Sequence, residues 1–265
     1  MRTQILPLSI LGSVSLAFLL GCGGSSGNNN TDQQTLPQAP SLEFANLTAA
    51  DFSLDDSNSA VKLPPSGVTQ FWEVRYVYNS GDDSDEVVSR RKVWGTENVT
   101  VEGVTFEAIT ATVSRLQGST WEVVENHIEG YTILHDWVWR YTDKYSDNGE
   151  LVSVLYPVAP TQLNNDSQFE TTDRWTVFRH HRVQTGVQSP APREEDNSIR
   201  VDFTFRESNG EVYTGDGHQY FGSEGLIYFY QRDDDQDGET EIRKLLNEEP
   251  TPNIKSSEAI PAYAF

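Results

Sequence analysis

Three aspartates near the C-terminal end of the chain have the spacing of a calcium-binding loop. Asp233, Asp235 and Asp237 alternate with other residues and are followed by Gly238. Alternate carboxylates in a tight turn can converge on one hard cation, and a glycine at this point allows the sharp turn that brings them together. The pattern predicts a weak calcium site with a stabilising role.

The residues around these three aspartates differ from those of the helix-flanked type of calcium loop. Its twelfth position holds Lys244, where such a loop uses a bidentate Glu, and the flanking residues have the composition of strands. If calcium binds, the dissociation constant should lie in the range of extracellular modules, roughly 10⁻⁴ to 10⁻³ M. A solvated acidic hairpin explains the same residues equally well, and both alternatives stay open.

The chain contains a single cysteine, Cys22, so it cannot form a disulfide within itself. Cys22 lies where an apolar stretch, residues 5–20, gives way to small polar residues, and Met1 and Arg2 precede that stretch. The stretch has the length of the apolar region of a secretion signal and is shorter than the ~20 residues of a membrane-spanning helix. We therefore expect residues 1–21 to be a targeting signal.

Leu19, Leu20, Gly21 and Cys22 resemble the lipobox of bacterial lipoproteins, which is Leu, a small residue, Gly or Ala, then Cys. Leu20 departs from that form, in which Ala or Ser is commoner. The resemblance implies that the signal is cut before Cys22, that its sulfur receives a diacylglycerol, and that the new amino terminus receives a further chain such as palmitate. Several acyl chains hold a protein stably on a membrane. By the same resemblance, Gly23 implies the outer membrane, facing the periplasm or the cell surface.

The segment after the cysteine has the composition of a tether. Residues 23–41 lack aromatic residues and any apolar period, and random-coil scaling gives them a reach of roughly 25 Å. The sequence thus predicts four parts, which are a signal (1–21), a lipidated cysteine with a flexible linker (22–66), a β domain (67–247) and a C-terminal tail (248–265).

From Thr69 onward, apolar and polar residues alternate with period two, which predicts strands with one face on a core. In residues 199–206, for example, Ile199, Val201, Phe203 and Phe205 alternate with polar residues. The other runs of this kind, rich in β-branched and aromatic residues, are 70–78, 87–94, 104–116, 120–126, 137–145, 150–156, 174–185, 225–232 and 240–246.

Short polar turns connect most of these runs. The Asn-Gly pairs at 148–149 and 209–210 are the strongest short hairpin signals, whereas 157–173 and 186–197 are predicted to be long loops. Sequential strands joined by short turns predict an all-β fold, an antiparallel up-and-down meander that forms an open or closed barrel-like sheet.

Residues 220–246 resemble the closing hairpin of β-meander lipoproteins of bacteria, in which an aromatic and a small residue precede Gly-x-Gly and a hydrophobic pair. Gly225, Leu226 and Ile227 match that pattern, and Ser223 stands in place of its first glycine. Proteins with this sheet shape include carriers of hydrophobic ligands on a half-barrel, so the resemblance implies such a role.

Charge and motifs narrow the classes of function. The chain has 40 Asp and Glu against 19 Lys and Arg, a net charge of −21, which disfavours nucleic acids as partners because phosphate contacts need a basic face. The sequence has no Gly-x-Ser-x-Gly, no His-Glu-x-x-His and no phosphate-binding glycine loop. We therefore expect no enzymatic activity and no cofactor other than the structural calcium.

Histidine and aromatic residues add little specificity. His180 and His181 are adjacent in a predicted strand, so they point to opposite faces and cannot share a metal. Trp137, Trp139 and Tyr141 share one strand face, which predicts either a core or an aromatic-lined hollow, and core is the commoner outcome.

Two functions are compatible with these features. The first is a lipid-anchored cell-envelope protein with a non-enzymatic binding or carrier role, whose sheet binds a hydrophobic small molecule. The alternative is a structural or interaction lipoprotein with a filled core, which acts on an envelope protein partner through its surface loops.

Overall fold

The fold is seen in a computed structural model of the chain. It describes residues 36–78, 86–145, 151–172, 178–208, 212–223, 225–234 and 239–251. Within them, the helical elements are two 3₁₀ turns, η1 (Phe44–Asn46) and η2 (Ala49–Asp51). No helix in this part of the chain has the length and apolarity needed to cross a membrane. The prediction of an all-β fold is confirmed.

All the strands belong to one sheet. They are β1 (Phe52–Ser53), β2 (Thr69–Tyr78), β3 (Glu86–Val101), β4 (Val104–Gln117), β5 (Thr120–Leu134), β6 (Trp137–Tyr145), β7 (Leu151–Pro160), β8 (Gln168–Thr172), β9 (Phe178–Val187), β10 (Ser198–Ser208), β11 (Val212–Gly222), β12 (Gly225–Asp234) and β13 (Glu239–Leu245).

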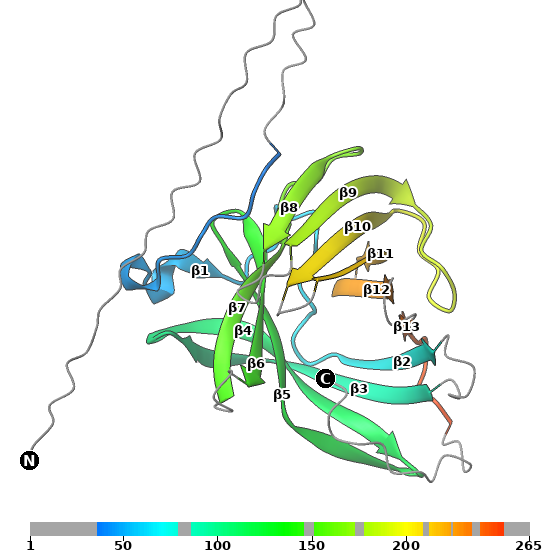
Figure 1. Cartoon of the computed structure of the whole chain (residues 1–265). Helices are drawn as coiled ribbons and strands as arrows, with labels where there is room; N and C mark the ends of the chain where they lie inside the picture. The colour runs from blue at the N-terminus through cyan, green and yellow to red at the C-terminus, as the bar shows by residue number, and fades with distance from the viewer. Residues whose placement is uncertain are drawn as a thin grey trace, which may run out of the picture. The chain divides into compact units, whose positions relative to one another are not determined.

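Strands β2 to β13 form an antiparallel meander whose two ends join. Each strand pairs with the next from β2 to β7 and from β8 to β13, and β13 pairs with β2. The sheet therefore curls nearly into a closed barrel, as Figure 1 shows, and the pairing order ends at β7 on one side and at β8 on the other. We call the gap between these two strands the seam. The predicted up-and-down meander is confirmed.

The predicted runs correspond to β2 to β7, β9, β10, β12 and β13. The prediction of one long loop over 157–173 is wrong, because β7 continues to Pro160 and β8 occupies Gln168–Thr172. β8 is too short to give a clear alternation. β11 was also missed, because its glycines weaken a strand pattern.

The glycines of β11 are explained by the strand beside it. Gly215 and Gly217 pair with Phe205 and Phe203 of β10, and a Cβ at either glycine would overlap the ring of its partner. The two rings occupy the space that side chains on β11 would otherwise fill, an arrangement in which an aromatic residue compensates for a glycine in a sheet.

Much of the segment assigned to the linker packs against the sheet, and it is described from Leu36 onward. β1 pairs with the end of β5, and Phe52 stacks on Phe106 of β4 with ring centroids 3.8 Å apart. Gln38 forms a parallel bridge with Glu170 of β8. The compact body of the chain therefore includes residues 36–66, and residues 22–35 of the predicted linker lie outside the described part.

The two faces of β4 are both buried. Phe106 and Ala108 lie on one face with Phe52, and Ala111 and Val113 lie on the other. Ala111 pairs with Glu129 of β5, whose side chain points into the barrel, so the second face lines the interior. The segment 36–63 covers the first face and contributes to the same core.

Candidate functional site

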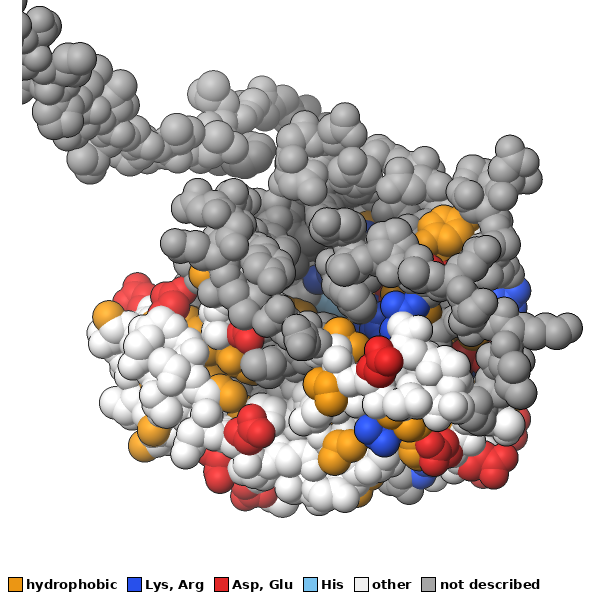
Figure 2. All heavy atoms as spheres, turned by 90° about the horizontal axis from the view of Figure 1, so that it is seen from below, with side chains coloured by type: hydrophobic (Ala, Val, Ile, Leu, Met, Phe, Trp, Pro, Cys, Tyr) orange, Lys and Arg blue, Asp and Glu red, His pale blue; other side chains and the backbone are white. Residues whose placement is uncertain are grey.

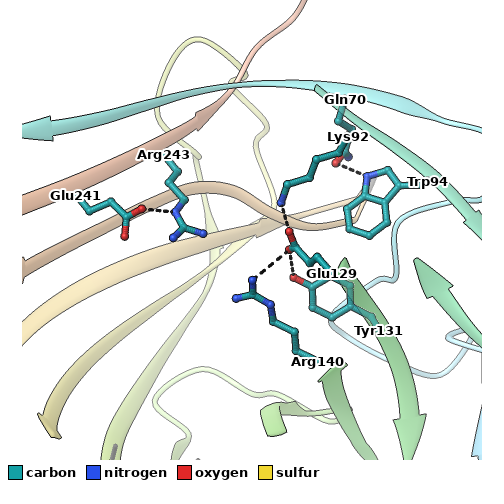
Figure 3. Close-up of polar contacts among 8 residues, drawn as sticks. All are labelled: Gln70, Lys92, Trp94, Glu129, Tyr131, Arg140, Glu241 and Arg243. Atoms are coloured by element: carbon teal, nitrogen blue, oxygen red, sulfur yellow. Dashed lines mark hydrogen bonds and ion pairs between the residues drawn. The ribbon is translucent and has the colours of Figure 1, made fainter. Parts of the chain in front are cut away.

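Charged side chains from strands on opposite sides of the barrel converge in its interior. Lys92 of β3, Glu129 of β5, Arg140 of β6 and Arg243 of β13 line one small cavity. β6 and β13 are not neighbours in the sheet, so their side chains can meet only across the barrel. Figure 3 shows these groups pointing toward one another. We call Arg90, Lys92, Glu129, Arg140, Glu241 and Arg243 the interior cluster.

Glu129 is the centre of the larger half of this cluster. Its Oε2 lies 2.6 Å from Lys92 Nζ and its Oε1 lies 3.9 Å from Arg140 Nη2 (Figure 3). Tyr131 donates a 2.6 Å hydrogen bond to the same Oε1. The Glu129 side chain is 5% exposed, so this carboxylate is stabilised by protein donors in place of water.

Two tryptophan rings lie close to Lys92. Lys92 Nζ lies 5.0 Å from the Trp72 ring centroid and 5.7 Å from that of Trp94, distances at which a cation is attracted to the ring face. Trp94 in turn donates a 2.8 Å hydrogen bond to Gln70 Oε1.

The other half of the cluster comes from β13 and β3. Arg243 Nε lies 2.7 Å from Glu241 Oε1, and the guanidinium of Arg243 lies 5.1 Å from the Tyr230 ring centroid. Arg90 donates a long 3.4 Å hydrogen bond to Tyr76. Pairing in the sheet brings these residues together, because Glu241 is opposite Tyr76.

Burial sets the protonation behaviour of the cluster. It lowers the pKa of Lys92 to about 8, although Glu129 acts in the opposite direction, and it also lowers the pKa of Arg90. Burial acts the same way on Arg243, but Glu241 outweighs it and raises the pKa of that guanidinium. The charges of Lys92 and Arg90 are thus held in the interior at a free-energy cost that their partners only partly offset, whereas the charge of Arg243 is stabilised by its partner.

The space among the interior-cluster residues is small. The cavity that they line measures about 30 Å³, which is far below the 300 Å³ or more of a typical small-molecule pocket. This part of the barrel, as far as its residues are described, is therefore filled by side chains.

A larger cavity, of about 460 Å³, lies at the seam. One wall is the segment 38–44, and the opposite wall comes from β6, β7, β8 and β9. We call it the seam cavity. Its apolar lining residues are Ala39, Pro40, Leu42, Phe44, Val101, Trp139, Leu155, Pro157 and Phe178.

The polar lining of the seam cavity is uncharged or acidic. Its charged side chains are Glu102 and Glu170, accompanied by Gln38, Ser41 and Thr172. Glu170 Oε2 accepts a 3.0 Å hydrogen bond from Gln38 Nε2, and its Oε1 lies 3.6 Å from His180 Nδ1. The described part of the lining contains no Lys or Arg, and this part suits a neutral or cationic group better than an anionic one.

The segment 38–44 is held in place by backbone pairing with β8. Ala39 N–H donates to the Glu170 carbonyl at 3.4 Å, and Glu170 N–H donates to the Pro37 carbonyl at 3.1 Å. On the other wall, Trp139 donates its indole N–H to the Leu134 carbonyl at 2.9 Å and is 2% exposed. The cavity therefore has walls whose main polar groups are already paired, which is typical of a preformed pocket.

The predicted site residues lie mostly outside the described residues. Cys22 is among those outside, as are Asp235 and Asp237. Asp233 is described, and its Oδ1 accepts a 2.7 Å hydrogen bond from Thr240 across the hairpin. Among the residues that the structure describes, no group of three His, Cys, Asp or Glu side chains is arranged to hold a metal. Lipidation of Cys22 and calcium at the acidic loop stay predictions.

The histidine and aromatic predictions can be compared with the structure directly. His181 is buried and stacks on Phe169 with centroids 4.3 Å apart, whereas the side chain of His180 is 38% exposed, so the two do point to opposite faces. Trp137, Trp139 and Tyr141 are all buried in the core. Trp139 also lines the seam cavity, so this residue belongs both to the core and to the lining of a hollow, the two alternatives that the sequence predicted.

The interior cluster is not among the predicted sites. Arg90 and Lys92 share a strand face with Val88 and Trp94, which are buried. Two cations at alternate positions between buried apolar residues are a signal of a charged interior, and this signal could have been seen in the run 87–94.

No protein-family model matches the sequence, and none of the curated proteins matches it. A solved structure described as "a putative lipoprotein from Parabacteroides distasonis ATCC 8503" aligns with 69% of this chain and 95% of that chain, at 11% identity and a TM-score of 0.37.

Proposed function

We propose that this chain is a lipid-anchored protein of the bacterial cell envelope that binds a small molecule in the seam cavity without catalysing a reaction. The observation that carries the binding role is the cavity itself, whose volume of about 460 Å³ falls in the 300–1,000 Å³ range of small-molecule pockets. The interior, at about 30 Å³, is too small for that role.

The lining of the seam cavity defines the class of ligand. Trp139, Phe44 and Phe178 offer aromatic surface for an apolar body or a sugar ring. Glu102 and Glu170 disfavour a carboxylate or phosphate and favour hydroxyl, amide or ammonium groups. The proposed ligand is therefore a neutral or cationic molecule with an apolar body, in contrast to a free fatty acid.

The membrane anchor is proposed from the sequence. The lipobox resemblance around Cys22 supports cleavage and acylation at that residue, and Gly23 supports the outer membrane. The seam cavity is walled by residues 38–44, so only a short stretch of chain separates it from Cys22.

A pair of variants tests the binding role. Nile red, a neutral apolar dye, should bind the full-length chain at one saturable site, and cis-parinaric acid, an anionic fatty acid, should bind much more weakly. Thr172→Trp fills the cavity from an exposed position on β8 and should abolish Nile red binding. Gln168→Trp is the matched control, because it adds the same ring to the same face of β8 away from the cavity. If Nile red bound equally well to Thr172→Trp and Gln168→Trp, the proposed binding site would be contradicted.

The anchor needs a separate measurement. Mass spectrometry of the protein purified from its native membrane should show a mature chain that begins at Cys22 and carries acyl groups. Cys22→Ser should move the protein to the soluble fraction with its fold intact. A mature chain that retains Met1 and a free thiol would contradict the anchor.

A structural or interaction role is the second candidate. The filled interior favours it, because a barrel packed with charged and aromatic side chains serves as a scaffold for surface loops. This role predicts no saturable binding of either dye. It also predicts that the protein is recovered with an envelope protein partner after cross-linking in cells.

A further inference from the structure

We propose that residues 252–265 pack on the outer face of strands β2 to β5 and cover an apolar surface there. This surface, which we call the outer patch, consists of Phe71, Val87, Val93, Trp121 and Val123. None of these residues lines the seam cavity, and the proposal does not depend on the function proposed above. Three features of the molecule point to it, namely the exposure of the outer patch, the course of the chain after β13 and the composition of the residues that follow Thr251.

The outer patch contains strongly exposed apolar side chains. Val87, Val93 and Val123 are 52%, 41% and 61% exposed. The two valines of β3 point outward, because Val88 and Trp94 beside them are buried and side chains alternate along a strand. On the face that Figure 2 shows, apolar side chains reach the surface at several places. Scattered apolar residues are ordinary on a folded protein, so the outer patch matters only if its members lie together.

Strand pairing brings the members of the outer patch together. Phe71 pairs with Arg91 of β3, which pairs with Ser114 of β4. Ser114 in turn pairs with Val123 of β5, so the side chains of this row point to the same side of the sheet. The Phe71 and Trp121 ring centroids lie 5.8 Å apart, and the Arg91 guanidinium lies 5.2 Å from the Trp121 centroid. Apolar residues that gather in this way mark a surface on which another segment packs.

The N-terminal part of the chain already covers a neighbouring surface of the same strands. Phe52 stacks on Phe106 of β4, and Val99 of β3 pairs with Phe106. Val99 is 7% exposed under this cover, whereas Val93, on the same face of the same strand, is 41% exposed. The outer face of the sheet therefore has one covered part and one part that the described residues leave open.

The chain that leaves β13 runs toward the outer patch. Leu246 N–H donates to the Phe71 carbonyl at 2.8 Å, which continues the pairing of β13 with β2. Soon after, Glu249 Oε1 accepts a 2.6 Å hydrogen bond from Trp121 Nε1 of β5. Thr251, the last described residue, follows within about 7 Å of extended chain. The residues after it therefore start beside the outer patch.

The residues after Thr251 have the length and composition of a covering segment. Their extended reach is roughly 46 Å, whereas β3 and β5 lie only about 10 Å apart in the sheet. Their side-chain charges cancel, in a chain whose net charge is −21. The charged residues are Lys255 and Glu258, and the large apolar ones are Ile254, Ile260, Tyr263 and Phe265. Burial of these apolar side chains against the valines of the outer patch is favourable.

A double-mutant cycle in the full-length chain tests the contact. Val123→Glu should lower the thermal unfolding midpoint by roughly 5 °C, because it places a charge beneath the covering segment. The fourfold change Ile254→Ser, Ile260→Ser, Tyr263→Ser and Phe265→Ser should lower the midpoint by a similar amount. The two changes together should cost less than the sum of their separate effects, because the glutamate then faces water. Additive effects would overturn the proposal.

Matched controls separate this contact from general effects of charge and polarity. Thr204→Glu adds the same charge at an exposed strand position of β10, and its effect should be the same with and without the four serines. Lys255→Ser combined with Glu258→Ser keeps the apolar residues of the segment and should leave the midpoint unchanged. A midpoint that rises with protein concentration would show that a second copy covers the outer patch, which would also overturn the proposal.

A photo-reactive side chain gives a test that does not depend on stability. With p-benzoylphenylalanine in place of Tyr263, irradiation should link the segment to β3 or β5 of the same chain, and mass spectrometry of the digested protein locates the link. Val123→Glu should weaken this link, and Thr204→Glu should keep it. Links confined to other parts of the barrel, to a second copy or to lipid would overturn the proposal.

Discussion

Lys92 and Glu129 form a 2.6 Å ion pair inside the barrel, with side chains 11% and 5% exposed. The two residues come from β3 and β5, which lie on either side of β4 in the sheet. The pair therefore spans a strand and connects two hairpins of the meander. Its burial makes it sensitive to the loss of either partner, because an unpaired charge in the interior is far more costly than an exposed one.

Glu129→Gln should lower the free energy of unfolding by about 3–5 kcal/mol, because Lys92 and Arg140 lose the carboxylate that offsets them. Chemical denaturation measures the change. Glu122→Gln, an exposed position on the same strand, should change it by less than about 0.5 kcal/mol. Adding Lys92→Met to Glu129→Gln should restore part of the loss. Equal stability of the two single variants would contradict this account of the cluster.

Lys92 should make the stability depend on pH in the alkaline range. Its pKa is about 8 when folded, against 10.5 for the free side chain. Below pH 8 the folded state carries the full cost of the buried charge. As the pH rises above 8, the folded state releases a proton that the unfolded state keeps, so the free energy of unfolding rises, by roughly 2 kcal/mol between pH 7.5 and 9.5.

The comparison with Lys92→Met isolates this effect, since all other titrating groups are common to both chains. Denaturation curves at the two pH values should show the increase only in the unmodified chain. The interior cluster would have to be rejected as the cause if Lys92→Met showed the same increase.

His181 should destabilise the fold in acid. Burial lowers its pKa from 6.5 to about 3, with Arg179 and His180 adding to the effect. Its Nε2 is hydrogen-bonded to Thr171 Oγ1 at 2.9 Å, and its Nδ1 is buried without a partner, so a second ring proton would have no acceptor. Below pH 6.5 the unfolded state binds a proton at this residue and the folded state does not. The free energy of unfolding should therefore fall by roughly 3 kcal/mol between pH 7 and pH 4.

His181→Phe removes this proton uptake while keeping the ring that stacks on Phe169. Unfolding followed at pH 7 and pH 4 should show a smaller acid loss in this variant than in the unmodified chain. His180→Phe, on the exposed face of the same strand, should keep most of the acid loss, because burial is the largest cause of the lowered pKa of His181 and His180 is the smallest. The same acid loss in all three chains would show that His181 is not the group responsible.

Gly217→Ala should destabilise the barrel, because the added Cβ would overlap the Phe203 ring and the Gln231 carbonyl oxygen. Overpacking of this kind costs about 1–3 kcal/mol. Gly95→Ala is the control, because it lies in β3 with nothing within 4 Å of the added Cβ, and it should be neutral or slightly stabilising. Denaturation midpoints of the two variants in the opposite order would contradict this role for the β11 glycines.

The strand order could be predicted because alternation and turn residues act locally. The Asn-Gly pairs and the period-two runs each need only a few neighbouring residues, and together they define the meander from β2 to β7 and from β9 to β13, except at β11. The glycines of β11 fit a strand because the rings of Phe203 and Phe205 on β10 fill the space beside them. This strand could therefore be predicted only with its partner strand known.

The two cavities could not be predicted, since each depends on long-range packing. The seam cavity has a wall from residues 38–44, which composition assigns to a tether, and it forms because Gln38 and Ala39 pair with β8. In the interior, the alternation of Arg90 and Lys92 with Val88 and Trp94 indicates an inward face for the two cations. The identity of the acid that pairs with Lys92 depends on β5, so Glu129 could not be assigned to it from the sequence.

Closure of the barrel by β13 against β2 has a consequence for how the chain folds. These are the first and last strands of the meander, so the contact that completes the sheet is also the one with the longest loop of chain between its partners, and such contacts form late and slowly. Until the last hairpin is synthesised, β2 presents an unpaired edge that can recruit other chains. A permuted chain that starts at β8 and ends at β7, with the present ends joined, would leave only residues 246–265 and 1–68 between β13 and β2. This connection is shorter than the present one, so the contact should form faster.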